Sequence, residues 1–208
     1  MNTFYGRMVK RVFDLVICII ALPLILLLGI ILALVVRITL GSPVFFSQQR
    51  LGFGGRRFAI TKFRTMTNER ASDGALLPDE QRLTAAGRFL RATSLDELPE
   101  VLSIFRGEMS LVGPRPLHAH YRDRYNEQQF RRHEVLPGIT GWAQVNGRND
   151  ISWEQKFALD VWYVEHQSLW LDLRILGMTL LKILSREGIS EPGHATAQEF
   201  RGTSGKEA

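Results

Sequence analysis

The sequence has little cysteine, which argues against a disulfide-stabilised protein. Cys18 is the single cysteine among 208 residues, which excludes an intrachain disulfide and is typical of a protein in a reducing compartment. Cys18 itself lies in an apolar run, where a thiol is more often a small buried hydrophobe than a reactive group. The sequence also has no internal repeat, and its length suffices for one domain with an appendage.

Negative charge is in deficit, and the formal net charge is +5. Such a surplus favours an anionic partner, which means nucleic acid, a phosphorylated small molecule or a lipid headgroup surface. Nucleic acid is disfavoured because the chain lacks a long lysine-rich tract and a series of stacking aromatics.

One long stretch, from Leu15 to Val36, has no charged residue at all. At about 1.5 Å per residue a helix of this length can cross a hydrocarbon core about 30 Å thick. A signal peptide is not indicated, because the apolar run is too long and no small-x-small cleavage site follows it.

Pro23 interrupts this run and removes a backbone donor, so it predicts a bent or broken helix. Basic residues flank the run on both sides, with Lys10 and Arg11 before it and Arg37 after it. Because positive flanks prefer the cytoplasm, we expect a re-entrant helix whose two ends stay on the cytoplasmic side. An ordinary kinked transmembrane helix is the alternative.

Two adjacent acids, Asp96 and Glu97, stand before an apolar run that ends near Gly107. Ser94 precedes Glu97 by three residues, which is the spacing of a capping box and predicts a helix start. The acids then have two interpretations. They cap the helix, or the helix dipole keeps Asp96 ionised as a nucleophile while its neighbour, about 100° away around the helix, holds a metal.

The segments 43–49 and 57–64 predict two strands joined by a glycine-bearing loop. Lys62 and Arg64 alternate on one face of the second strand, either as a solvated strand end or as a pair of substrate cations. Residues 67–82 predict an exposed loop, and the helix after it carries Arg88 and Arg91 towards the acids.

Arg115 stands between Pro114 and Pro116 on a stiff, extended segment, where a guanidinium is pre-positioned for phosphate or simply faces solvent. The glycine-rich segment 137–148 contains Asn146 and Arg148 and predicts a substrate-lining loop or a structural turn.

The segments 152–166 and 169–186 predict two helices, the first a core helix and the second a basic amphipathic helix suited to the headgroup plane. We therefore expect an α/β fold that is mostly helical with a small β-hairpin, a re-entrant membrane helix and amphipathic interfacial helices. The expected divisions are a membrane segment at 1–40, a cytoplasmic catalytic domain at 41–190 and a polar tail at 191–208.

Four motifs together resemble the bacterial sugar transferases, the monotopic polyprenyl-phosphate phosphoglycosyl transferases of the small, minimal type. The resemblance covers nearly the whole chain, and its motifs are Lys62-Phe-Arg-Thr-Met66, Ser94-Leu-Asp-Glu-Leu-Pro99, Ser110-Leu-Val-Gly-Pro-Arg-Pro116 and Pro137-Gly-Ile-Thr-Gly-Trp-Ala-Gln-Val-Asn-Gly-Arg148. It implies transfer of a sugar 1-phosphate from a UDP-sugar to undecaprenyl phosphate, with release of UMP, a covalent intermediate and a Mg²⁺ ion. It also implies the bacterial inner membrane, on its cytoplasmic face, with membrane lipid as a partner.

Carried over by motif, the resemblance makes Asp96 the nucleophile and Glu97 the magnesium ligand. The implied phosphate-facing cations are Lys62, Arg91, Arg115 and Arg148, while Arg64 and Asn146 are weaker substrate-binding candidates. Members of the family usually break the membrane helix at a Ser-Pro pair, where this chain has Leu22-Pro23. Three further residues, Arg88, Asp160 and Asp172, either line the site or support it.

Two rival functions stay open at this point. A membrane-bound diphosphate hydrolase would use the same acids with water as the acceptor, and a basic membrane-surface scaffold would need no catalysis. The sequence does not name the sugar or the glycan pathway, and it leaves a homodimer open.

Overall fold

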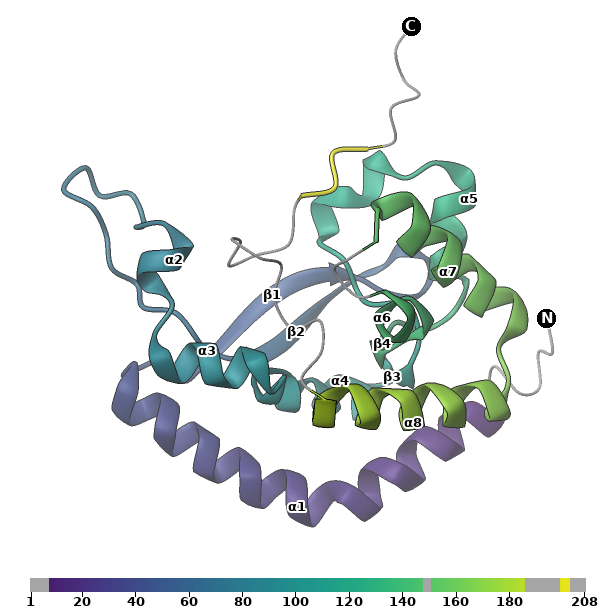
Figure 1. The fold of residues 1–208 in the computed structure, drawn as a ribbon, viewed down its shortest axis with the longest axis horizontal. Coiled ribbons are helices and arrows are strands. Elements are labelled where there is room, and N and C mark those ends of the chain that lie inside the picture. Colours follow the sequence, from purple (N-terminus) through teal and green to yellow (C-terminus); the bar gives the residue numbers. More distant parts are fainter. Residues whose placement is uncertain (1–7, 148–150, 186–198, 203–208) are drawn as a thin grey trace, which may run out of the picture.

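The computed structural model describes residues 8–147, 151–185 and 199–202 (Figure 1). It confirms the predicted fold class, because helices dominate and the strands form two small two-stranded sheets. A long bent helix, α1, lies along one side of the molecule, and the remaining elements form a body above it (Figure 1).

Helix α1 (Lys10–Thr39) contains Pro23 close to its midpoint. The helix bends in its middle, so that both of its ends rise towards the body of the protein (Figure 1). A proline inside a helix removes one backbone hydrogen bond and clashes with the preceding turn, which accounts for a bend at this place. By length and composition α1 is apolar enough to cross a membrane.

Each arm of α1 contacts the body along one stripe and exposes most of its remaining surface. Most large apolar side chains between residues 19 and 31 are exposed, Ile20 at 75%. The buried residues of the helix recur at four-residue spacing, which places them on one stripe of each arm; they are Lys10, Asp14 and Cys18 in the first arm and Leu32 and Val36 in the second.

The predicted hairpin is present as β1 (Phe45–Leu51) and β2 (Arg57–Phe63), antiparallel and joined by the short 3₁₀ helix η2 (Phe53–Gly55). The first strand begins two residues later than predicted. Directly paired residues share a face of a sheet; the pairs on the face that matters below are Phe46 with Lys62, Gln48 with Ile60, and Arg50 with Phe58.

The predicted loop over 67–82 is mostly irregular and projects from the body (Figure 1), but it ends in a short helix, α2 (Asp79–Arg82). Helix α3 (Ala85–Ala92) follows, and the Gly87 amide donates to the Thr84 hydroxyl as an N-terminal cap, at 3.0 Å. A Cβ at Gly87 would lie 1.9 Å from the Thr65 carbonyl oxygen, so only glycine allows α3 to approach the end of β2 this closely.

A second sheet, absent from the sequence-based expectations, pairs β3 (Ser110–Val112) with β4 (Gly138–Thr140) in parallel. The glycine-rich segment 137–148 therefore forms a strand and a short helix, α6 (Trp142–Asn146), rather than a plain loop. Its glycines allow the backbones to meet, because a Cβ at Gly138 would lie 2.1 Å from the Gly113 amide nitrogen.

Helices α7 (Trp153–His166) and α8 (Leu169–Ser185) agree with the prediction to within a residue at each end. The apolar stripe on α7 is core as expected, since its side chains Phe157, Val161 and Val164 are buried. Five shorter elements complete the described fold: η3 (Leu95–Glu100), α4 (Val101–Arg106), η4 (Ala119–Arg124), α5 (Glu127–Phe130) and η5 (Arg131–Glu134).

Helix α8 exposes large apolar side chains, with Trp170 at 77%, Leu180 at 64% and Leu181 at 67% exposure. Together with α3 and α4 it lies at one level above α1 (Figure 1). An amphipathic helix with exposed tryptophan and leucine, next to an apolar helix, is typical of a membrane-associated surface.

Most of the predicted polar tail lies outside the described residues, but Phe200 is 1% exposed. Its ring contacts four aromatic side chains of the body, those of Tyr121, Tyr125, Trp153 and Phe157. The described part of the tail therefore packs against the body, because the Phe200 side chain is buried in an aromatic cluster.

Candidate active site

Asp96 and Glu97 lie on the 3₁₀ helix η3 (Leu95–Glu100), which leads into α4 (Val101–Arg106). The predicted capping box is wrong: Ser94 has a left-handed backbone, with φ of 55°, and its side chain makes no capping hydrogen bond. The chain turns sharply at Ser94 between α3 and η3, and Pro99 lies in the last turn of η3. Gly107 ends α4 as predicted, with φ of 80°.

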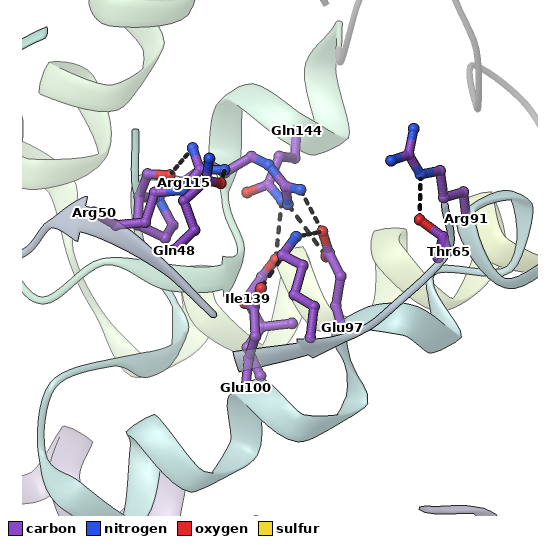
Figure 2. Close-up of polar contacts among 11 residues, drawn as sticks. Gln48, Arg50, Thr65, Arg91, Glu97, Glu100, Arg115, Ile139 and Gln144 are labelled. Atoms are coloured by element: carbon purple, nitrogen blue, oxygen red, sulfur yellow. Dashed lines mark hydrogen bonds and ion pairs between the residues drawn. The ribbon is translucent and has the colours of Figure 1, made fainter. Parts of the chain in front are cut away.

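Glu97 is the centre of a cluster of charges (Figure 2). Lys62 on β2 places Nζ 2.5 Å from the Glu97 carboxylate and 3.2 Å from that of Glu100. Arg115 donates from both Nη atoms to Glu97, one of them at 3.3 Å. We call Lys62, Glu97, Glu100 and Arg115 the active-site cluster.

The two adjacent acids have opposite electrostatic environments. Burial, and next the Glu97 charge, raise the pKa of Asp96 to about 6, although Lys62, Arg115 and Arg91 act against the shift. Burial also opposes ionisation of Glu97, but Arg115 and Lys62 outweigh it and hold the pKa of Glu97 well below its usual range. With a pKa of about 6, Asp96 is mostly ionised at pH 7, as predicted, but nearby cations rather than a helix dipole favour the charged form.

Arg91, in the last turn of α3, reaches the site from another direction than Arg115 (Figure 2). Its Nε donates to the Thr65 hydroxyl at 3.0 Å. This contact fixes a guanidinium near enough to Asp96 to favour its ionised form.

The segment that carries Arg115 is held at each carbonyl along its length. The Gly138 amide donates to the Pro114 carbonyl at 3.1 Å, and Arg132 Nη2 donates to the Arg115 carbonyl at 2.7 Å. Arg50 Nη1 lies 3.4 Å from the Pro116 carbonyl. The extended, proline-flanked segment is thus as rigid as the sequence predicted.

Arg50 and Gln48 are site residues that the sequence reasoning missed. Both share the hairpin face of Lys62, and Arg50 donates to the Gln48 side chain at 2.6 Å. Burial, and then the nearby Arg115 charge, lower the pKa of Arg50 to about 10, which still leaves it cationic at pH 7. Alternation along the two strands could have placed both residues on the face of Lys62, but only if the pairing register of the hairpin had been known.

Among the weaker candidates, Arg64 serves a different purpose from the one predicted. It is 8% exposed and donates to the carbonyls of Leu40 and Ser42, so it caps the chain where α1 ends. Asn146 is exposed and donates to the Trp142 carbonyl at 2.8 Å. Arg148 lies outside the described residues.

The structure shows the positions of the three residues that were predicted either to line the site or to support it. Arg88 is exposed and donates to the Leu83 carbonyl at 3.0 Å. Asp160 is buried and pairs with Arg132 at 2.8 Å, and Asp172 is buried and pairs with Lys10 at 2.5 Å. Both of these acids support the structure.

The sequence profile of the bacterial sugar transferases matches residues 5–186, which include the hairpin, both acids and Arg115. The chain belongs to this family. It is a transferase, as the names of its relatives consistently state. A "sugar transferase EpsL" of Bacillus subtilis, described as uncharacterized, is 55% identical over 93% of this chain and 96% of its own length.

Two longer relatives of the family have names that state an activity. The UDP-galactose-lipid carrier transferase of Erwinia amylovora is 38% identical over 88% of this chain. The UDP-glucose:undecaprenyl-phosphate glucose-1-phosphate transferase of Xanthomonas campestris pv. campestris is 37% identical over 88%. The chain spans 42% and 40% of their respective lengths, so their activities belong to the whole of those proteins.

Proposed function

We propose that this protein transfers a sugar 1-phosphate from a UDP-sugar to undecaprenyl phosphate and releases UMP, through a phosphosugar bound covalently to Asp96. The observation that carries the proposal is the pair of adjacent acids with opposite environments. Glu97 is held ionised by Lys62 and Arg115, while the Asp96 carboxylate is left as a nucleophile. The printed activities of the longer relatives support the substrate classes.

In the first step, an oxygen of Asp96 attacks the sugar-bearing phosphorus of the donor. The bond from that phosphorus to the bridging oxygen breaks, and the electron pair leaves with UMP. Because the carboxylate is ionised at pH 7, this attack needs no general base. Lys62, Arg91 and Arg115 can offset the negative charge that develops on the phosphoryl and on the leaving group.

In the second step, a phosphate oxygen of the lipid attacks the same phosphorus. The bond between Asp96 and phosphorus breaks, which regenerates the carboxylate and gives a lipid diphosphate sugar. The acceptor is already an anion, so this attack needs no strong base either.

The carboxylates of the site fit a Mg²⁺ ion, which is bound in such enzymes by one or two carboxylates together with substrate phosphates. Glu97 would hold the ion, because its pKa keeps it ionised at every physiological pH. The metal would supply charge neutralisation on the diphosphate. Lys62 and Arg115 now occupy the oxygens of Glu97, so we expect the diphosphate to draw both cations towards itself.

The shape of α1 supports a position on the cytoplasmic face of the inner membrane. Both ends of the bent helix face the body, its exposed apolar side chains lie between them, and Arg11 and Arg37 flank its apolar part. A helix that enters and returns to one face would hold Asp96 at the level where a lipid phosphate presents its head. Cysteine labelling at position 2 with an impermeant reagent tests this, since labelling from the periplasm contradicts it.

The decisive experiment is intact-protein mass spectrometry of the purified chain, incubated with Mg²⁺ and a panel of UDP-sugars without lipid. We expect a mass increase of one phosphosugar and an equal amount of UMP, both absent in Asp96→Asn and present in the matched control Asp73→Asn, on an exposed turn. An adduct that survives Asp96→Asn contradicts the assignment. With lipid added, a lipid-linked sugar indicates transfer, whereas free sugar phosphate indicates hydrolysis.

A further inference from the structure

A buried ion pair lies behind the Arg115 segment and has no part in the chemistry described above. Arg132 on η5 is 2% exposed, and Asp160 on α7 is 4% exposed. Arg132 donates to a single carboxylate oxygen of Asp160, from Nε at 3.0 Å and from Nη2 at 2.8 Å. The guanidinium also lies over the Phe157 ring, 5.7 Å from its centroid, which is a cation–π contact.

The same Nη2 atom donates to the Arg115 carbonyl oxygen at 2.7 Å, which joins the buried pair to the active site. The neighbours of Arg115 are prolines, which have no amide hydrogen to donate. The two prolines thus donate no backbone hydrogen bonds beside Arg115, and the Arg115 carbonyl accepts its hydrogen bond from a side chain of another element.

Stability is a weak explanation for a pair of this kind. Two buried charges can often be replaced by well-packed apolar side chains with no loss of stability, because desolvation offsets their attraction. An apolar pair, however, cannot donate to the Arg115 carbonyl. Arg131, the neighbour of Arg132, pairs with Glu165 at 2.7 Å across the same two elements from an exposed position. An exposed pair contributes little stability, so it offers a matched comparison for the buried pair.

We propose that Arg132, oriented by Asp160, is a positioning residue that fixes the Arg115 backbone and so determines where the Arg115 guanidinium meets the donor diphosphate. Arg115 has a long side chain, so a small backbone rotation moves its guanidinium by a much larger distance. Misplacement of a binding group by about 1 Å can reduce catalysis about a hundredfold. This inference rests on the proposed function, in which Arg115 contacts the donor.

The test uses the double variant Arg132→Met/Asp160→Leu in the full-length chain, because it leaves no unpaired buried charge. We expect its thermal unfolding midpoint to stay close to that of the wild type. We expect kcat/KM for the UDP-sugar to fall about 10- to 100-fold in the UMP-release assay, while kcat/KM for undecaprenyl phosphate, which reports the second step, stays unchanged. The matched control Arg131→Gln breaks the exposed pair between the same elements and should change neither value.

A double-mutant cycle with Arg115→Gln separates positioning from a general structural role. If Arg132 acts through Arg115, adding Arg132→Met/Asp160→Leu to Arg115→Gln should cause little further loss in kcat/KM for the donor. Full additivity of the two losses overturns the proposal, as does an unchanged kcat/KM in a folded double variant. A wild-type chain that releases no UMP with any donor would instead overturn the proposed function.

Discussion

Two clusters of charge in this protein use the same residue types with different exposure. The active-site cluster pairs Glu97 with Lys62, whose side chains are 13% and 17% exposed, and with Arg115 at 43%. The second, which we call the anchor cluster, pairs Asp172 with Lys10 at 0% and 4% exposure. The first can therefore exchange its partners for a ligand, whereas the second is sealed.

The anchor cluster joins the start of α1 to the core. Besides the Lys10 pair, Asp172 accepts a hydrogen bond from the Tyr163 hydroxyl at 2.7 Å, and Asp14 accepts one from Ser110 at 2.6 Å. Its partners come from α1, β3, α7 and α8, although Asp14 Oδ1 is buried without a hydrogen-bond partner among the described residues. Charge in this cluster thus helps to attach the bent helix to the core, whereas charge in the active-site cluster is the part that we propose binds the donor.

The largest effect should come from breaking the anchor cluster. Lys10→Met leaves Asp172 buried without its cation, and we expect the free energy of unfolding to fall by about 3–5 kcal/mol. Chemical denaturation in a fixed detergent measures the loss. The double variant Lys10→Met/Asp172→Leu should recover most of it, and a single variant as stable as Arg131→Gln would contradict the sealed-cluster interpretation.

The next effect should come from Glu97→Gln, which removes a charge from the active-site cluster. We expect UMP release to slow at least about a hundredfold, since a charged group aimed at the diphosphate or its metal is lost. The thermal midpoint should fall modestly, because the lowered pKa of Glu97 means that its charge stabilises the folded state, while Glu100 remains as a partner for Lys62. A large loss of stability with the rate preserved would reverse the contrast between the clusters.

The smallest effect is the pH dependence that burial gives to Asp96. With a pKa of about 6, the ionised fraction, and with it UMP release without acceptor, should fall about tenfold for each pH unit below 6. Glu97 does not titrate in this range, and the pKa of His118 is lowered to about 4 by burial. A rate that is flat from pH 5 to 7 would argue against Asp96 as the nucleophile.

The same shift has a consequence for stability that Asp96→Asn can measure. The folded pKa of Asp96 lies above its unfolded value, so the folded state loses stability as pH rises from about 4 to 6 and regains none above it. A shift of about two pH units corresponds to about 2–3 kcal/mol. We expect the thermal unfolding midpoint of Asp96→Asn to lie above that of the wild type at pH 7, and this difference to disappear at pH 4.

Local patterns predicted the elements that depend on neighbouring residues. Pro23 predicted the bend in α1, the alternation over 57–64 predicted the strand β2 that carries Lys62, and the paired prolines predicted an extended segment at Arg115. In each case the relevant physics lies within a few residues of the position, so the sequence alone carries it.

The failures involve partners that are distant in the sequence or an unusual backbone. Ser94 has a capping-box neighbour, but its left-handed backbone overrides the pattern. Arg64 has the charge and the strand position expected of a substrate-binding residue, yet its guanidinium donates to backbone carbonyls just after α1. Arg132 and Asp160 are 28 positions apart, and nothing local connects either of them to Arg115.

The bend in α1 also has a consequence for the bilayer. Each arm has about 15 residues and so measures roughly 20 Å, which is less than the hydrocarbon thickness of about 30 Å. Inserted with the bend foremost, the helix displaces acyl chains mainly in one leaflet and leaves the opposite leaflet nearly complete. A re-entrant α1, as proposed above, would therefore act as a one-sided wedge, and its insertion should depend on lateral pressure and headgroup size in the leaflet that it occupies.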